Sequence, residues 1–312
     1  KPCPRSRSRE GADSFGERYM KQDRPFPAVT VTKKAELALR SGHPWVYAAE
    51  ITAREGDCPS GGIVDVFAPK GAWLGAGFYS AESKIGVRVL SDNANERFGP
   101  AFFERRVKYA LDYRRAVMGA DFGCCRLIFG EADGLPGLTV DRFSNLLCAQ
   151  VLSRGTDGVK DIIYAALLEQ LAAMGERIDG IYERNESGIR ALEGLEQYKG
   201  WYAGAPHPES ALTEICENGV RYAVDLENGQ KTGFFLDQKY NRLAVARLAA
   251  CSTASRTPAL SPSTAPARAR STSPRWTCPN PPWPSRGKTP PSTAWRTKWT
   301  SWRRTYSTCC QS

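Results

Sequence analysis

Residues 228–250 read NGQKTGFFLDQKYNRLAVARLAA, and this stretch divides the chain into two parts of different character. Asn228 and Gly229 predict a turn, the Thr/Phe/Leu run after them is strand-like, and an amphipathic helix is expected from about Asp237. The residues before this stretch have the composition of an ordinary globular protein. Residues 252–312 do not: they hold ten of the 21 prolines and five of the eight tryptophans, with no valine, isoleucine, phenylalanine or acidic residue.

The charge of the chain gives no argument for nucleic-acid binding. The formal net charge is +10, but residues 252–312 alone carry ten Lys and Arg and no Asp or Glu. The remaining 33 basic residues are balanced by 33 acidic residues, so the body of the chain is neutral. An inference of RNA binding must therefore rest on motifs.

The ten cysteines contain no Cys-x-x-Cys and no metal-ligand spacing, which predicts reduced thiols and no metal site. No apolar run approaches about 18 residues, and no secretory signal opens the chain. The sequence therefore predicts a cytoplasmic protein without a membrane partner. Its oligomeric state stays open.

The first part of the chain is predicted to hold a small β-barrel. Residues 1–19 are polar, lack periodicity and precede Met20, so they are expected to be a disordered leader. Within residues 20–95, one short helix at 34–40 and several short strands, among them an alternating run at 85–89, indicate the barrel.

An α+β arrangement is predicted next, in a central domain over residues 96–210. Residues 102–117 have the apolar spacing of an amphipathic helix. Three strands, a helix at about 157–174, a strand at 180–184 and a helix from near Ser187 follow. Residues 211–250 add a hairpin around Asn218-Gly219 and the helix described above. Carboxylates in the Gly/Pro-rich turn after the first strand, Glu131 and Asp133, are expected to brace the turn rather than to catalyse.

Four phrases carry a resemblance to one family: LRSGHPWVYAAEI (39–51), GGIVDVFAPKGAWLGAGFYS (61–80), FGEADGLPGLTVDRF (129–143) and GQKTGFFLDQKYNR (229–242). The chain resembles the S-adenosylmethionine-dependent methyltransferases of cytosine C5 in large-subunit ribosomal RNA. In that family an RNA-binding PUA barrel and a central α+β domain precede a Rossmann-like α/β methyltransferase domain. The resemblance covers about residues 27–250.

The resemblance implies S-adenosylmethionine as cofactor, near Phe234, Phe235, Asp237 and Gln238, and ribosomal RNA as partner. It also implies a cysteine thiolate that attacks C6 of cytosine before the methyl group reaches C5. The family's nucleophile lies beyond the part that matches, so no catalytic residue is assigned.

The predicted barrel carries a second set of candidates, for RNA binding. Arg40, His43, Lys84 and Arg88 are the candidate phosphate contacts, and Trp45 is a candidate stacking surface. Lys84 and Arg88 alternate with Ile85, Val87 and Val89, which places them on the opposite face of a strand. In the alternative interpretation Trp45 belongs to the core, His43 is a turn residue, and the charges form a solvated face.

A change of reading frame after about residue 250 explains the tail. Read one base out of frame, Thr253–Ser261 permit DCFTHTGSF, which resembles the family's first cofactor-binding motif. Trp276 followed by Thr277 forces an Asp at position 277, 18 positions after the recovered Gly at 259. A glycine-rich turn followed about 20 residues later by an acid is the pattern that binds a nucleotide cofactor. The alternative is a genuine basic, Trp-interleaved tail that binds single strands.

Two functions therefore remain open. In the first, the chain is a member of the methyltransferase family whose out-of-frame residues 251–312 leave it catalytically incompetent. In the second, residues 20–250 form a non-catalytic RNA-binding module.

Overall fold

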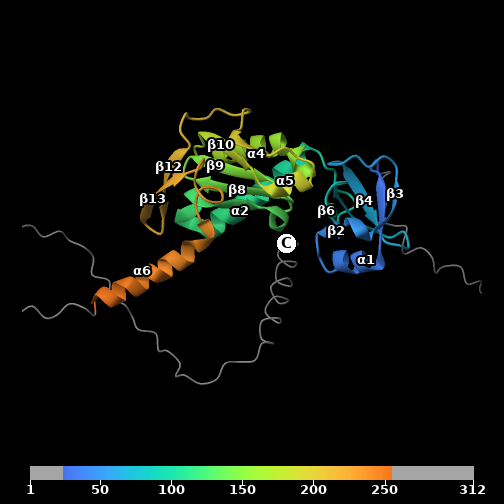
Figure 1. Ribbon diagram of the computed structural model, residues 1–312, viewed down its shortest axis with the longest axis horizontal. Coiled ribbons are helices and arrows are strands. Elements are labelled where there is room, and N and C mark those ends of the chain that lie inside the picture. Colours follow the sequence, from blue (N-terminus) through green and yellow to red (C-terminus); the bar gives the residue numbers. More distant parts are fainter. Residues whose placement is uncertain (1–23, 255–312) are drawn as a thin grey trace, which may run out of the picture. The chain divides into compact units, whose positions relative to one another are not determined.

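The computed structural model describes residues 24–254, coloured in Figure 1. Its elements form three sheets, with six, five and two strands. The predicted leader and most of the predicted out-of-frame tail lie outside the described residues.

A curled six-stranded sheet forms the N-terminal part, in the order β2-β6-β5-β4-β1-β3. β1 pairs in parallel with β4, and the other neighbours are antiparallel. Buried valines, such as Val31, Val66 and Val87, fill its core together with Ala35 of α1. Its elements are β1 (Ala28–Val31), α1 (Lys33–Arg40), β2 (Trp45–Tyr47), η1 (Ala48–Glu50), β3 (Ile51–Glu55), β4 (Ile63–Phe67), β5 (Trp73–Tyr79) and β6 (Ile85–Ser91).

A five-stranded sheet forms the central domain, in the order β11-β10-β9-β8-β7, with β9 and β10 parallel. The predicted helix at about 157–174 is present as α4, whereas the short α3 before it and β11 were not predicted. Its elements are α2 (Pro100–Met118), η2 (Gly119–Gly123), β7 (Cys124–Phe129), η3 (Gly130–Asp133), β8 (Leu138–Phe143), β9 (Leu146–Val151), α3 (Arg154–Asp157), α4 (Lys160–Ala173), β10 (Gly180–Asn185), α5 (Gly188–Leu192) and β11 (Tyr198–Trp201).

Side chains of the central sheet alternate between two cores, as the period of a strand requires. In β9, Leu147 and Ala149 pack with α2 and α4, whereas Leu146 and Cys148 pack on the opposite face. The first core also contains Phe78 and Leu90 of the N-terminal sheet. The two sheets are therefore joined by a shared apolar core.

The predicted hairpin is present as β12 (Leu212–Glu217) and β13 (Val220–Asp225). Asn218 and Gly219 both have positive φ, 51° and 79°, as a two-residue turn of type I′ requires. Ile215 and Val224 pack against the central sheet on the face away from α2.

The strand-like interpretation of the run after Gly229 is wrong. Residues 230–235 form turns, followed by a short 3-10 helix, η4 (Leu236–Gln238), and by α6 (Lys239–Ala254). The reason lies in the side chains, because Thr232 bonds a carboxylate of the central sheet and Phe234 packs into the hairpin core. The predicted helix after Asp237 is confirmed.

Candidate functional site

A buried carboxylate ties the 228–238 segment to the central sheet. Asp141 of β8 is fully buried and accepts hydrogen bonds from Nε and Nη2 of Arg126, at 2.7 and 3.0 Å. The same carboxylate accepts a hydrogen bond from the hydroxyl of Thr232, at 2.5 Å. A buried charge is stable only when it is paired and hydrogen-bonded, so these contacts fix the segment over β7 and β8.

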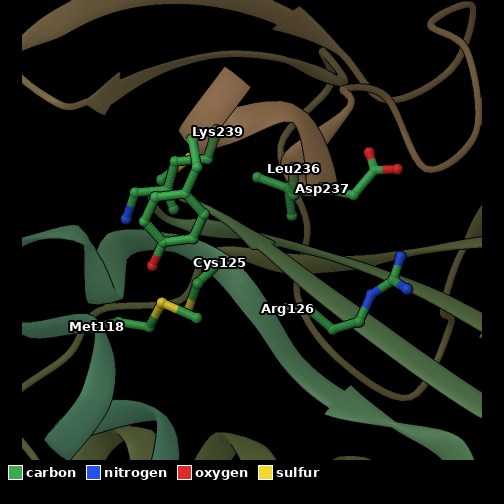
Figure 2. A pocket seen from close by; sticks show the side chains of 8 residues that line it. Met118, Cys125, Arg126, Leu236, Asp237 and Lys239 are labelled. Atoms are coloured by element: carbon green, nitrogen blue, oxygen red, sulfur yellow. The ribbon is translucent and has the colours of Figure 1, made fainter. Parts of the chain in front are cut away.

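The segment and β7 enclose a pocket of about 250 Å³ (Figure 2). In Figure 2 Arg126 and Asp237 lie on the same side of the pocket, and Met118 lies on the other. The lining is mostly apolar, with charged groups at its edge. It consists of Met118, Cys124, Cys125, Arg126, Leu236, Asp237, Lys239 and Tyr240.

The two thiols in this pocket are protonated at neutral pH. Burial raises the pKa of Cys124 to about 12 and that of Cys125 to about 11. A thiolate, not a thiol, is the nucleophile in cysteine chemistry. Cys124 and Cys125 therefore form part of the apolar wall of the pocket.

Charged groups at the pocket edge are paired. The hydrogen bond from Lys231 to Asp237, at 3.1 Å, lowers the pKa of the Asp237 carboxyl. Lys239 is buried and pairs with Asp121 at 2.5 Å. The pocket lining therefore presents the carboxylate of Asp237 and the cations of Arg126 and Lys239, each of them already paired.

Of the four predicted cofactor residues, Asp237 alone lines this pocket. The ring of Phe234 packs on Tyr222, with centroids 5.2 Å apart, beneath the guanidinium of Arg242. The ring of Phe235 lies 4.7 Å from Nζ of Lys231, and Gln238 is exposed and bonded to Asn241. Arg126 was not predicted as a site residue, because nothing in the pattern of a strand marks a residue that meets a segment more than 100 positions later.

The predicted stacking residue Trp45 bridges the two domains. Its indole N–H donates to Oε1 of Glu131 at 2.9 Å, and its ring lies edge-on to His43 at 5.7 Å. His43 is exposed, and Tyr47, which the sequence analysis missed, is 41% exposed with its ring 6.3 Å from that of His43. The exposed rings here are therefore His43 and Tyr47.

Arg88 of β6, a predicted phosphate contact and in the alternative interpretation part of a solvated face, is buried in the structure. Arg88 is only 7% exposed, and its Nη2 pairs with Oε1 of Glu193 at 2.6 Å. The face opposite Val87 is covered by the central domain, which sequence alternation does not reveal. Lys84, at the start of this run, is exposed as predicted, and Arg40 is exposed and pairs with Glu36 at 3.0 Å.

The carboxylates of the turn after β7 act as braces, as predicted. Oδ2 of Asp133 accepts the backbone N–H of Phe129 at 2.6 Å and an N–H of Arg114 at 2.7 Å. Glu131 accepts the indole N–H of Trp45. Both carboxylates are therefore engaged in positioning neighbouring elements.

Neither a metal site nor a membrane-spanning helix is found within residues 24–254. No group of three or more His, Cys, Asp or Glu side chains in this range is arranged to hold a metal ion. Each helix in the same range is too short or too polar to cross a membrane.

Comparison with known proteins gives three results. The family model of the PUA-like domain matches residues 29–92. "Ribosomal RNA large subunit methyltransferase I" of Klebsiella pneumoniae is 38% identical over 229 residues, which are 73% of this chain and 56% of that protein. The protein of the same name from Aliivibrio fischeri is 38% identical over 216 residues, 69% of this chain and 53% of that protein. The chain thus spans about half the length of these relatives.

Two solved structures share the fold. One is a putative SAM-dependent methyltransferase from Streptococcus mutans, with a TM-score of 0.56 and 21% identity over 70% of this chain and 53% of that one. The other is a putative methyltransferase complexed with SAH, with a TM-score of 0.56 and 20% identity over 69% of this chain and 52% of that one. The N-terminal sheet is therefore a PUA-like domain, and the chain is homologous to the ribosomal RNA large subunit methyltransferase I proteins.

Proposed function

We propose that this protein is a cytoplasmic member of the system that methylates large-subunit ribosomal RNA at C5 of a cytosine, with S-adenosylmethionine as methyl donor. The observation that carries the proposal is the 38% identity over 229 residues to proteins named for this RNA. In this account the PUA-like and central domains bind RNA.

The described residues supply one wall of a cofactor site. The pocket beside Asp237 measures about 250 Å³, below the roughly 300–1,000 Å³ of complete small-molecule sites. A class I cofactor site also needs backbone amides from a glycine-rich turn. The parallel crossover from β9 to β10 carries no Gly-x-Gly-x-x-Gly turn. When bound, S-adenosylmethionine would supply the electrophilic methyl group, and Asp237 and Lys239 would be positioned at the edge of its site.

No described cysteine is poised as the nucleophile of this chemistry. Burial raises the pKa of Cys124, Cys125 and Cys148, and burial is also the main cause of the raised pKa of Cys58. Cys216 is exposed on β12, away from the pocket lining. We therefore infer that the chain as written does not transfer a methyl group, and that its cofactor motif is encoded out of frame after about residue 250.

The RNA-binding part of the proposal rests on exposed groups of the PUA-like domain. His43 and Tyr47 offer ring faces, while Arg40 and Lys84 offer cations near strand β2 and the start of β6. Arg88 is left out of this set because it is buried in its pair with Glu193, whereas Arg40 stays exposed beside Glu36. Trp45 contributes by fixing the position of His43 through ring contact.

The second candidate function is that of a non-catalytic RNA-binding module, and it applies if the chain as written is the functional form of the protein. The PUA-like and central domains share an apolar core, and in this alternative they bind structured RNA without chemistry. Binding of S-adenosylmethionine after restoration of the reading frame separates the two functions, because only the enzyme needs the cofactor.

The experiment that tests the proposal is binding of the chain to a large-subunit ribosomal RNA transcript. Saturable binding that weakens with salt is expected. No detectable binding at low salt would overturn both the enzyme and the RNA-binding module.

A further inference from the structure

Two exposed aromatic rings lie on α2 and β7, the elements that also carry Met118 and Arg126 of the pocket lining. Tyr113 of α2 is 45% exposed, and Phe129 at the end of β7 is 54% exposed. Tyr109, one helical turn before Tyr113, is 57% exposed. Large apolar side chains that gather on a surface mark a binding site more often than isolated ones do.

The rings of Tyr113 and Phe129 each lie beside an arginine that is paired with a carboxylate. The guanidinium carbon of Arg114 lies 4.9 Å from the ring centroid of Tyr113, and that of Arg126 lies 5.2 Å from the ring centroid of Phe129. Arg114 pairs with Asp133, and Arg126 pairs with Asp141. A guanidinium beside an aromatic ring is an attractive contact.

The two rings also belong to one hydrogen-bonded unit. Nε of Arg114 donates to the backbone carbonyl of Arg126 at 2.9 Å. Asp133, the partner of Arg114, accepts the backbone N–H of Phe129. β7 is the edge strand of the sheet, so these two bonds satisfy backbone groups on its open edge. These bonds tie the end of β7 to α2, the two elements that carry the rings, while about half of each ring residue stays open to solvent.

The charge around the rings fits a polyanion. α2 carries five cations (Arg105, Arg106, Lys108, Arg114 and Arg115) against two carboxylates (Glu104 and Asp112). Arg115 is exposed, and Lys108 is exposed although it pairs with Asp112 at 2.7 Å. Lysines are depleted from the centres of protein–protein interfaces, whereas lysines beside aromatic rings are usual where proteins bind single strands.

From this juxtaposition we propose that Tyr113 and Phe129, with Tyr109 at their margin, form a stacking surface for unpaired bases of the RNA. This surface is distinct from the rings of the PUA-like domain, and the inference rests on the proposed function. Base stacking on aromatic side chains tolerates any sequence, because every base has a π-face. The surface would thus hold a single-stranded segment next to the pocket edge at Arg126 and Asp237.

Fluorescence anisotropy with a labelled 12-nucleotide single-stranded RNA and the full chain tests the proposal. Tyr113→Ala and Phe129→Ala are each expected to raise the Kd about tenfold, since each removes one stacking contact. Tyr113→Phe and Phe129→Tyr keep the rings and are expected to bind as the unaltered chain does. Leu192→Ala, at an exposed apolar residue of α5, is the control.

Four outcomes would overturn the stacking surface. The first is an unchanged Kd for both alanine variants, and the second is an equal loss in the ring-keeping variants. In the third, the alanine variants change the self-association of the chain but not its RNA affinity, which would make this a protein contact. In the fourth, the chain binds the ribosomal transcript but not the single strand, and the proposed function then stands. Failure to bind either RNA would overturn both proposals.

Discussion

Arg88 of β6 and Glu193, the residue after α5, form an ion pair at 2.6 Å that joins the PUA-like domain to the central domain. The side chains are 9% and 2% exposed. Glu193 also accepts the backbone N–H of Arg154 at 3.4 Å. The pair therefore stabilises the contact between domains and is not available to a ligand.

Breaking this pair from one side should destabilise the protein strongly. Arg88→Met leaves the Glu193 carboxylate buried without its partner, and such losses amount to about 3–5 kcal/mol. The double variant Arg88→Met/Glu193→Leu should lose less than Arg88→Met alone, because no uncompensated charge remains. Urea unfolding measures both free energies, with Leu192→Ala as control. A loss below about 1 kcal/mol for Arg88→Met would contradict the assignment.

The exposed cations of the PUA-like domain should contribute to RNA affinity through phosphates. Replacing Arg40 and Lys84 with Ala is expected to weaken binding of ribosomal RNA and to flatten its salt dependence, because fewer counterions are released. Each lost phosphate contact changes the logarithmic slope by about 0.7–0.9. Lys70→Ala, at an exposed lysine between β4 and β5, is the matched control. An unchanged slope would assign Arg40 and Lys84 to ordinary solvated surface.

Removal of the Thr232 hydroxyl should loosen the 228–238 segment. Thr232→Val deletes the hydrogen bond to the Asp141 carboxylate, and a hydrogen bond to a charged group contributes about 1.5–3 kcal/mol. We expect faster amide hydrogen exchange across residues 228–238, with little change in the PUA-like domain. Thr52→Val, which removes an exposed hydroxyl bonded to the Thr30 carbonyl, is the control. Equal exchange in the variant and the unaltered chain would show that the segment is held by other contacts.

The buried thiols beside the pocket should make stability fall at alkaline pH. Burial raises the pKa of Cys124 and Cys125 from the ordinary 9.0 to about 12 and about 11. Folded pKa values above the unfolded ones mean that this contribution is complete below pH 9 and is lost as the pH rises toward 11–12. The urea midpoint should therefore decline above pH 9, and less steeply in Cys124→Ala/Cys125→Ala. Iodoacetamide at pH 8 should modify exposed Cys216 and spare both buried thiols. Their rapid modification in the folded protein would refute this account.

The local pattern of the chain predicted much of the fold because the signals involved are short-range. Asn218-Gly219 specifies its hairpin through the positive φ of both residues. The alternation of Val29 and Val31 gives a strand with one buried face. The amphipathic pattern of 102–117 gives α2, although Val117 is 50% exposed and Phe102 is buried instead.

Long-range packing accounts for what the sequence did not predict. The alternation of apolar and charged residues around Arg88 shows that the two faces of β6 differ. It does not show that the central domain covers the face that carries Arg88. Thr232 and Phe234 have strand-forming side chains, yet their partners in the central sheet and the hairpin core decide their conformation. The pocket brings Cys125 and Asp237 together across more than 100 positions of the chain, a distance that no periodicity spans.

Calorimetric titration of S-adenosylmethionine tests most directly our central proposal, that this chain is related to RNA methyltransferases but carries its cofactor motif out of frame. The chain as written should give no saturable heat, because position 259 is Ala and position 277 is Thr, where the restored frame has Gly and Asp. A one-base insertion or deletion near codon 251 that restores DCFTHTGSF should produce saturable binding. Micromolar binding by the chain as written, or no binding after restoration, would contradict the account.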